Sequence, residues 1–229
     1  MNSPLSGLAA LMSVVMSLAG CAVTAGTAVV TSTPSISLPK NPTSPDAAPE
    51  LAALVVKGRA PMTGYTRAKF GQAWADVDRN GCDTRDDILK RDLESATFRQ
   101  GTHGCVVLSG TLADPYTRKI ISFTKAQAIA VQIDHVVALG DSWQTGSADW
   151  TAATRLAFAN DPLNLLAVDG HANQSKSDSD AASWLPPNKA FRCAYVTRQV
   201  AVKTKYGLWV TPAEHDAIER VLSTCGTGS

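Results

Sequence analysis

The hydrophobic positions along the chain fall into short runs separated by turn residues, a pattern that predicts an α+β fold. Residues 105–112 and 119–123 are strand-like segments on either side of a turn at Asp114-Pro115-Tyr116. Together they predict a β-hairpin. Residues 132–139 and 163–168 are two further apolar runs of strand length, so we expect a second set of strands later in the chain.

Other segments have the spacing of helices. In residues 67–75, Phe70 and Trp74 lie four positions apart and share one face of a helix. Residues 86–93 open with acidic side chains, which suit a helix N-terminus. Pro212 suits the first turn of another helix. The expected helices are 67–75, 86–93, 151–159, 173–184, 190–206 and 212–222.

The beginning of the chain has the features of a targeting segment. Residues 7–20 are apolar but too short to span a bilayer comfortably. Leu18-Ala19-Gly20-Cys21 looks like the lipobox of a bacterial lipoprotein, in which Cys21 is lipidated and becomes the mature N-terminus. No Lys or Arg precedes the apolar run, and the alternative is a plain secretory signal in which Cys21 is incidental. Both alternatives export the protein, either to the outer face of the cell membrane or to the medium.

We expect three parts along the chain. Residues 1–21 form the signal peptide, and residues 22–50 are rich in Thr, Ser, Pro and Ala, which predicts an extended tether. Residues 51–226 form a single folded domain, and we expect contact with a membrane only through Cys21. The whole chain has 229 residues and a net charge of +1, which gives no sign of a strong general attraction to nucleic acid but leaves a local basic groove open.

Export bears on the remaining cysteines, because an oxidising compartment permits disulfides. Cys82, Cys105, Cys193 and Cys225 allow three pairings. We favour Cys82–Cys105 and Cys193–Cys225, because each closes a short local loop. A zinc site built from the four thiolates is the alternative, although the chain has no Cys-x-x-Cys spacing.

Two polar residues interrupt the apolar run QIDHVVAL at 132–139. Asp134 and His135 are neighbours, so on a strand their side chains point to opposite faces. Asp134 is a candidate metal ligand and His135 a candidate general base, while a hydrogen-bonded structural histidine is the alternative. Asn164 lies in the next apolar strand, where its amide needs partners. Asn173 follows at the start of a polar segment, NQSKSDSD.

A strand with Asp-His, a returning strand with Asn, and a helix with Asn and Lys is the order of a ββα-metal finger. At these positions the chain resembles the HNH endonuclease superfamily. It also resembles exported actinobacterial HNH nuclease-like proteins, which share a catalytic region with the C-terminal domain of modification-dependent restriction enzymes. That wider resemblance covers about residues 60–225 and rests on NGCDTRDDIL, GCVVLSGTLADPYT, IDHVVAL, NDPLNLLAV and SWLPPNKAFRCAYVTRQVAVKTKYGL.

The resemblance implies a metal-dependent endonuclease with an HNH finger inside a single domain. One Mg²⁺ or Mn²⁺ would be held by Asp134 and the side-chain carbonyl of Asn173, since hard cations prefer oxygen ligands. His135 would take a proton from the attacking water, and Asn164 would orient His135 or the loop behind it. The implied substrate is nucleic acid, with DNA favoured over RNA.

Phosphate binding requires positive charge near this site. Lys176 lies about one helical turn beyond Asn173, and Arg85 is a second candidate because a guanidinium binds phosphate bidentately. The alternative for Arg85 is neutralisation by the neighbouring Asp83, Asp86 or Asp87. Further along the chain there are two interpretations, a basic face over which the duplex runs or, as we prefer, a solvated helix surface, for Arg192, Arg198, Lys203 and Lys205. His171 is either an additional ligand or, as we prefer, a loop residue.

A calcium loop competes for one segment of the chain. A D-x-D-x-N-G pattern with an acid at the twelfth position resembles such a loop. Against it, the last ligand is Asp where Glu is usual, and Asp83 stands at a normally apolar position. Structural Ca²⁺ is therefore the less favoured hypothesis for Asp76, Asp78, Asn80, Gly81, Thr84 and Asp87.

The rival function from another class is a non-catalytic surface lipoprotein, a calcium- or partner-binding module on a degenerate HNH scaffold. The presence of Asp134, His135, Asn164 and Asn173 together favours catalysis, since a binding module has no need of all four. A zinc-dependent wall hydrolase is disfavoured, because the four histidines are scattered without ligand spacing. Specificity, the biological role and the oligomeric state are left open by the sequence.

Overall fold

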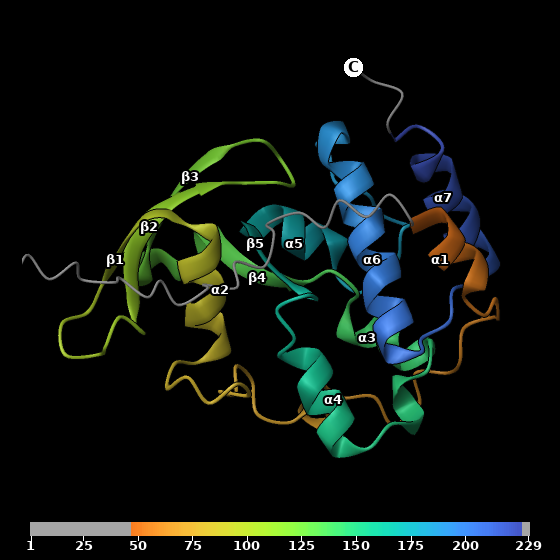
Figure 1. The fold of residues 1–229 in the computed structure, drawn as a ribbon, viewed down its shortest axis with the longest axis horizontal. Coiled ribbons are helices and arrows are strands. Elements are labelled where there is room, and N and C mark those ends of the chain that lie inside the picture. The colour runs from red at the N-terminus through yellow and green to blue at the C-terminus, as the bar shows by residue number, and fades with distance from the viewer. Residues whose placement is uncertain (1–46, 226–229) are drawn as a thin grey trace, which may run out of the picture. The chain divides into compact units, whose positions relative to one another are not determined.

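The computed structural model describes residues 47–225, which belong to one compact unit of the chain. Helices are combined there with two small antiparallel sheets, so the predicted α+β class is confirmed (Figure 1). Within these residues no helix has both the length and the apolar composition that are needed to span a membrane. Cys21, the signal peptide and most of the expected tether lie outside the described residues. Helix α1 (Ala47–Ala53) begins inside the segment expected to be tether, and Leu51 packs into the core.

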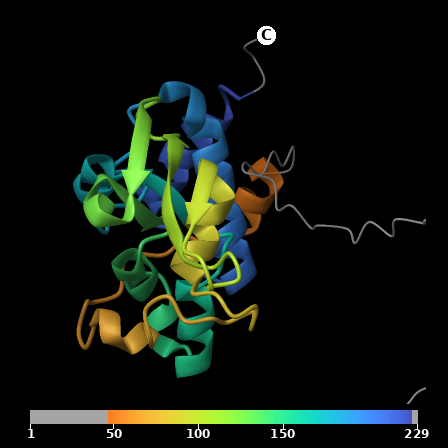
Figure 2. The ribbon, with the colours of Figure 1, turned by 90° about the vertical axis from the view of Figure 1, so that its left-hand side faces the viewer.

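The first sheet has three antiparallel strands in the order β1-β2-β3, which Figure 2 shows side by side. Strands β2 (Val107–Ala113) and β3 (Ile120–Thr124) form the predicted hairpin, with Thr111 opposite Ser122. Strand β1 (Glu94–Phe98) was not predicted. Its sequence, ESATF, is mostly exposed and has no apolar alternation, so only the pairing with β2 marks it as a strand.

The second sheet is the antiparallel pair β4 (Val131–His135) and β5 (Leu165–Asp169), with His135 opposite Leu165. All five residues of β5 are buried. The prediction that the strand continues to residue 139 is wrong. Strand β4 ends at His135, and after a short bend the chain enters α3 (Leu139–Gln144).

The two faces of the β4–β5 pair contact different parts of the core. Val131 and Ile133 pack against α2 (Thr84–Asp92), whereas Val136, beyond the end of β4, packs in the cluster that includes residues of α6 (Arg192–Tyr206). Figure 1 shows α2 and α6 on opposite sides of the pair. Asp134 and His135 therefore enter different environments, because neighbouring side chains on a strand alternate between faces.

A third apolar cluster lies beside the end of β4 and includes Phe70, Val137 and Phe158. It joins α3 to α4 (Ala152–Ala159), which was predicted almost to the residue, and to a short 3-10 helix, η1 (Arg67–Phe70). The expected helix 67–75 is wrong beyond Phe70. Gly71 has φ +82° and Trp74 has φ +58°, so the backbone leaves the helical region there.

Helix α5 (Gly170–Lys176) starts and ends earlier than the predicted 173–184. The side chain of Asp169 accepts a hydrogen bond from the backbone of Ala172 and caps its start. Helices α6 and α7 (Pro212–Leu222) closely match their predictions. The remaining short 3-10 helices are η2 (Lys125–Ala130), η3 (Ser147–Asp149) and η4 (Lys189–Phe191).

Both disulfides of the favoured pairing are present. Cys82–Cys105 joins the segment before α2 to the segment before β2, and Cys193–Cys225 joins the start of α6 to the end of the described chain. Because all four sulfur atoms are used in these bonds, the alternative of a four-thiolate zinc site is wrong.

Candidate active site

Asp134 is buried on the α6 side of β4. Its carboxylate accepts one hydrogen bond from the Tyr116 hydroxyl at 2.5 Å and another from the Lys176 ammonium at 2.9 Å. Burial raises the pKa of the Asp134 carboxyl, although Lys176 and Tyr116 oppose that shift by stabilising the charged form. Both carboxylate oxygens are thus occupied by donors from the protein itself.

Lys176 is not available to a phosphate. Its side chain is 0 % exposed, and its Nζ donates to Asp134 and to the backbone carbonyl of His135 at 2.8 Å. The structure therefore contradicts the prediction that Lys176 binds substrate. Its charge instead neutralises a carboxylate inside the core, which is the usual requirement for burying either group.

Of the two expected metal ligands, Asp134 does not fit a divalent cation in this arrangement. Asp134 already has an ammonium group at the position where a cation would lie. The Nδ2 of Asn173 donates to the side chain of Gln132 at 2.8 Å, a bond that orients the amide but does not use Oδ1, the predicted ligand atom. Among the described residues, neither group of three acidic or histidine side chains close enough to share an ion includes Asp134 or His135. We therefore correct the assignment of Asp134 as a metal ligand, whereas a ligand role for Asn173 stays a prediction.

His135 lies on the other face of β4 and is 8 % exposed. Its Nε2 is 2.9 Å from the carbonyl oxygen of Ala159, the last residue of α4. A carbonyl can only accept, so Nε2 carries the proton and Nδ1 keeps its lone pair. Burial lowers the pKa of His135 to about 4, and the positive charges of Arg67 and Lys176 act in the same direction. The imidazole is therefore neutral at neutral pH, as a general base must be.

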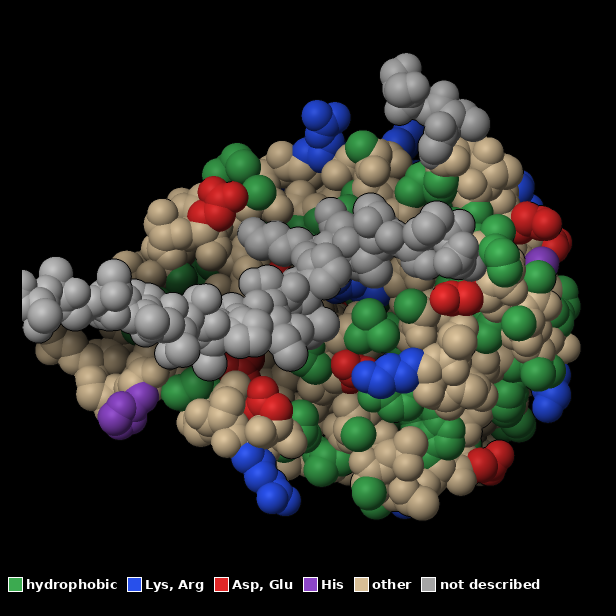
Figure 3. All heavy atoms as spheres, viewed as in Figure 1, with side chains coloured by type: hydrophobic (Ala, Val, Ile, Leu, Met, Phe, Trp, Pro, Cys, Tyr) green, Lys and Arg blue, Asp and Glu red, His purple; other side chains and the backbone are tan. Residues whose placement is uncertain are grey.

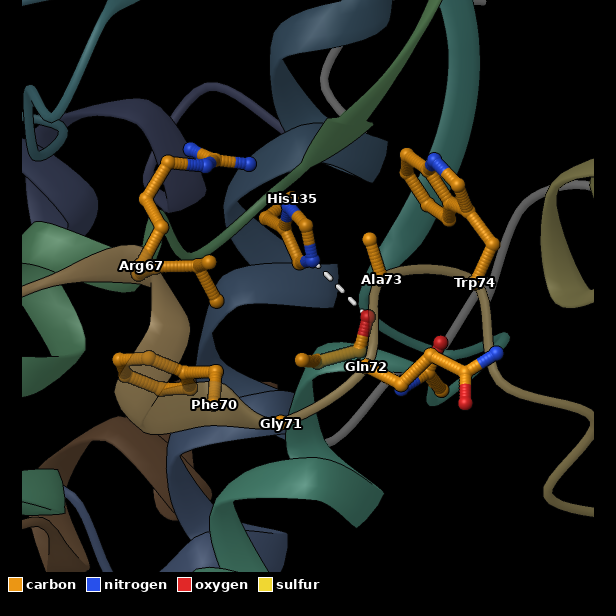
Figure 4. A pocket seen from close by; sticks show the side chains of 10 residues that line it. Arg67, Phe70, Gly71, Gln72, Ala73, Trp74 and His135 are labelled. Atoms are coloured by element: carbon orange, nitrogen blue, oxygen red, sulfur yellow. Dashed lines mark hydrogen bonds between the residues drawn. The ribbon is translucent and has the colours of Figure 1, made fainter.

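A pocket opens beside His135. Its volume is about 60 Å³, which is room for a few water molecules. Figure 4 shows the side chains of Arg67 and Trp74 on either side of the His135 ring. The polar and aromatic groups around the pocket come from η1 and the stretch after it, the end of β4 and the end of α4. They include Arg67, Gln72, Trp74, His135 and Asn160.

Asn164 fastens the bend that follows His135. Its Oδ1 accepts from the backbone nitrogen of Val137 at 2.8 Å, and its Nδ2 donates to the carbonyl of the same residue at 3.1 Å. The backbone carbonyl of Asn164 accepts from Val136 as well. These contacts are those of a residue that orients the loop behind His135. Its effect on catalysis stays a prediction.

Comparison with known proteins places this arrangement in a family. Residues 83–221 match the family described as GmrSD restriction endonucleases, C-terminal domain. The chain belongs to that family. An uncharacterized secreted protein of Arthroderma benhamiae is 37% identical over 205 residues, which cover 89% of this chain and 96% of the relative. No solved structure matches the chain significantly.

In this GmrSD C-terminal domain, Arg85 lies away from His135. Its guanidinium is 3.4 Å from the carbonyl oxygen of Val131, at the opposite end of β4, and burial lowers its pKa. The nearby charges of Asp86 and Asp83 oppose that shift. The structure thus does not bring Arg85 to the candidate base, and its role in binding substrate stays a prediction.

At Arg198 and Lys203 both predictions for the later helices are wrong, the basic face and the preferred solvated surface. Arg198 and Lys203 are buried, and Lys203 pairs with Asp141 and Glu214. Lys205 pairs with Asp161 at 2.6 Å. On the uncovered part of the face in Figure 3, Lys and Arg side chains occur singly rather than gathered. His171 is exposed in the first turn of α5, so the preferred prediction of a loop residue is wrong, and no described contact of its side chain suggests a ligand.

The segment that resembles a calcium loop is held together by Asn80. Its side-chain amide donates to Asp78 and Asp87 at 3.1 Å, and its backbone nitrogen lies 3.1 Å from Asp76. The acidic side chains thus converge, but on protein donors, with Asp76 and Asp78 exposed and Asp87 half-buried. Structural Ca²⁺ at this loop stays a prediction.

Sequence reasoning missed Arg67, Trp74 and Asn160 as parts of the site. Arg67 and Trp74 were both assigned to the short helix 67–75. That prediction gave no reason to expect their side chains on either side of His135. The available signal was indirect, because the Gly71 that follows Phe70 is a common helix terminator. Asn160 ends α4 next to Ala159, the residue that binds His135.

Proposed function

We propose that this protein is an endonuclease that hydrolyses phosphodiester bonds with His135 as its general base. Family membership supports a nuclease-type domain. The observation that carries the proposal is the state of His135, which is neutral, fixed in one tautomer by Ala159, and placed in the wall of a pocket. In this proposal β4, β5 and α5 form the ββα unit of an HNH nuclease.

The proposed reaction uses the free lone pair at Nδ1 of His135. A water molecule attacks the phosphorus and transfers its proton to Nδ1, while the bond to the 3′-oxygen breaks and that oxygen takes a proton from solvent. The products carry 5′-phosphate and 3′-hydroxyl ends. The negative charge of the bound phosphodiester raises the pKa of His135 from its value in the empty pocket, which makes the imidazole a better proton acceptor.

Dependence on one Mg²⁺ or Mn²⁺ remains a prediction from the resemblance to HNH nucleases. Because Asp134 is paired with Lys176 and does not fit a cation as it is arranged, the proposed reaction has no step through a metal. The nucleic acid is also a proposal, and we expect DNA before RNA.

Export is part of the same proposal. The relative from Arthroderma benhamiae is named as a secreted protein, and two disulfides suit an oxidising compartment. We further propose that Cys21 carries a lipid that anchors the domain to the outer face of a membrane.

The test is cleavage of plasmid DNA and of labelled DNA and RNA oligonucleotides by the purified protein. Each substrate is incubated with Mg²⁺, with Mn²⁺ and with EDTA, alongside His135→Ala and the matched control His171→Ala. We expect cleavage by the wild type and by the control, and its loss in His135→Ala. Full activity of His135→Ala would overturn the assignment of the base. Inactivity on every substrate would favour the non-catalytic binding module.

A further inference from the structure

Three groups around the His135 pocket are not used by the proposed hydrolysis. They are the indole of Trp74, the guanidinium of Arg67 and the side-chain oxygen of Asn160. Each offers a different kind of contact, namely a flat aromatic face, a positive charge and a hydrogen-bond acceptor. Together they match the three chemical parts of a nucleotide that a protein usually contacts, which are the base, the phosphate and a polar edge.

The ring of Trp74 lies beside the ring of His135, the candidate general base. The Trp74 and His135 rings are nearly parallel, with an angle of 16° and 6.0 Å between their centroids. The backbone of Trp74 has φ +58°, which a tryptophan rarely adopts. It is held there because its carbonyl accepts from the backbone of Thr84, whose hydroxyl binds the next carbonyl at Ala75.

Arg67 supplies an exposed positive charge at the same pocket. It forms no ion pair among the described residues, yet its charge contributes to the lowered pKa of His135. The segment that carries it is anchored by Phe70, which is buried, and by Arg155, whose Nε donates to the carbonyl of Lys69 at 2.9 Å. The guanidinium is therefore carried on a fixed segment and is free to bind an anion.

Asn160 has an unused acceptor. Its side chain is 1 % exposed, and its Nδ2 donates to the carbonyl of Leu156 at 2.9 Å. Its Oδ1 has no hydrogen-bond partner among the described residues. A buried acceptor without a donor is unfavourable and usually marks the place of a water molecule or a ligand group. Because Asn160 lines the pocket, a donor that enters the pocket is the available partner.

We infer that this pocket is a subsite for one unstacked nucleotide, in which Trp74 stacks on the base, Arg67 binds a phosphate and Asn160 accepts a hydrogen bond from the nucleotide. The inference rests on the proposed nuclease function and extends it to a substrate class. His135 is almost buried, and the pocket has room for a phosphate group or the edge of a base but not for a duplex. A phosphodiester reaches His135 only where the strand is free to leave the stack. The preferred substrate is therefore a single strand or an unpaired nucleotide.

The test measures binding separately from cleavage. The full chain carrying His135→Ala is titrated against a fluorescently labelled single-stranded oligonucleotide and against the same sequence as a blunt duplex, using anisotropy. We expect the single strand to bind at least ~10-fold more tightly. In that background, Trp74→Ala should weaken single-strand binding about 5- to 100-fold, and Trp74→Phe should retain most of it, because a phenyl ring still stacks.

Arg67→Gln should weaken binding and lower the slope of log Kd against log salt by about one phosphate contact. The exposed Arg220 on α7 provides the matched control, and Arg220→Gln should leave both quantities unchanged. Thermal melts establish that each variant is folded. If Trp74→Ala does not fold, Arg67→Gln decides the outcome.

Two results separate the failure of this inference from the failure of the proposed function. Equal binding of single strand and duplex, or binding that ignores both Trp74 and Arg67, would overturn the subsite even if His135-dependent cleavage is observed. Single-strand binding that depends on Trp74, in a protein that cleaves nothing, would instead support the subsite and refute catalysis.

Discussion

The Nε2 atom of His135 lies 2.9 Å from the carbonyl oxygen of Ala159, so the end of β4 is tied to the end of α4 by the candidate base itself. The two residues are 24 positions apart in sequence. This bond decides which nitrogen keeps a lone pair, and it fixes the ring relative to the pocket. A hydrogen bond from one ring nitrogen to a backbone carbonyl distinguishes a positioned general base from a surface histidine.

The first prediction concerns the pH dependence of cleavage. In the free protein the pKa of His135 is about 4, because burial disfavours the imidazolium ion. Since kcat/KM reports ionisations of the free enzyme, its acid limb should lie near pH 4 rather than at the ordinary histidine value. Rates across a pH series at constant ionic strength would show this. An acid limb at or above pH 6.5 would contradict the assignment.

The same histidine should make folding stability depend on pH. Its folded pKa is lower than its unfolded value, so the unfolded state binds more protons between about pH 6.5 and pH 4. The stabilising contribution is fully present above this window and is lost as the pH falls through it, by roughly 3 kcal/mol. We therefore expect the difference in free energy of unfolding between wild type and His135→Asn, measured with urea, to change by about that amount from pH 7 to pH 4, because only the wild type loses the contribution. A difference that stays constant with pH would show that the imidazole is not buried in its neutral form.

The buried pair Asp134–Lys176 gives a third prediction. Removing one partner leaves an uncompensated buried charge, so Asp134→Asn and Lys176→Met should each lower the free energy of unfolding by about 3–5 kcal/mol. The double variant should lose clearly less than the sum, because neither charge is left alone. Denaturant unfolding of the four proteins measures this coupling. Additive losses would mean that Lys176 does not neutralise Asp134.

Lys176 shows which features could be predicted from the sequence and which could not. The alternation of strand residues correctly put Asp134 and His135 on opposite faces, and the local spacing of cysteines gave both disulfides. The helix that carries Lys176 was expected to begin at Asn173, whereas Asp169 caps it and Gly170 starts it. Lys176 lies about one helical turn beyond Asn173 in either case. Its burial depends on Asp134 and on the carbonyl of His135, to which its ammonium donates, and no local pattern indicates those contacts.

A different limit applies to the pocket. Trp74 contributes to it only because the backbone adopts a positive φ after η1, and no local rule assigns that conformation to a tryptophan. The conformation at Gly71 is easier to predict from the sequence, because glycine readily adopts a positive φ. A Cβ at this position would also lie 2.8 Å from the side chain of Leu156. Long-range contacts, rather than local propensity, place this segment beside His135.

Asn164 provides the last prediction, because it links stability to the geometry of the site. Both of its amide atoms bind the backbone of Val137, two residues after His135, and the side chain is fully buried. Asn164→Ala leaves a backbone donor and acceptor without partners, so the free energy of unfolding should fall by about 2–4 kcal/mol. Because the bend after His135 loosens, kcat should fall more than KM rises in the fraction that remains folded. Asn188→Ala is the matched control, since Asn188 binds the carbonyl of Pro115 and should affect stability alone. Steady-state kinetics on folded protein, with the folded fraction measured by circular dichroism, would decide the matter, and an unchanged kcat in Asn164→Ala would refute the supporting role.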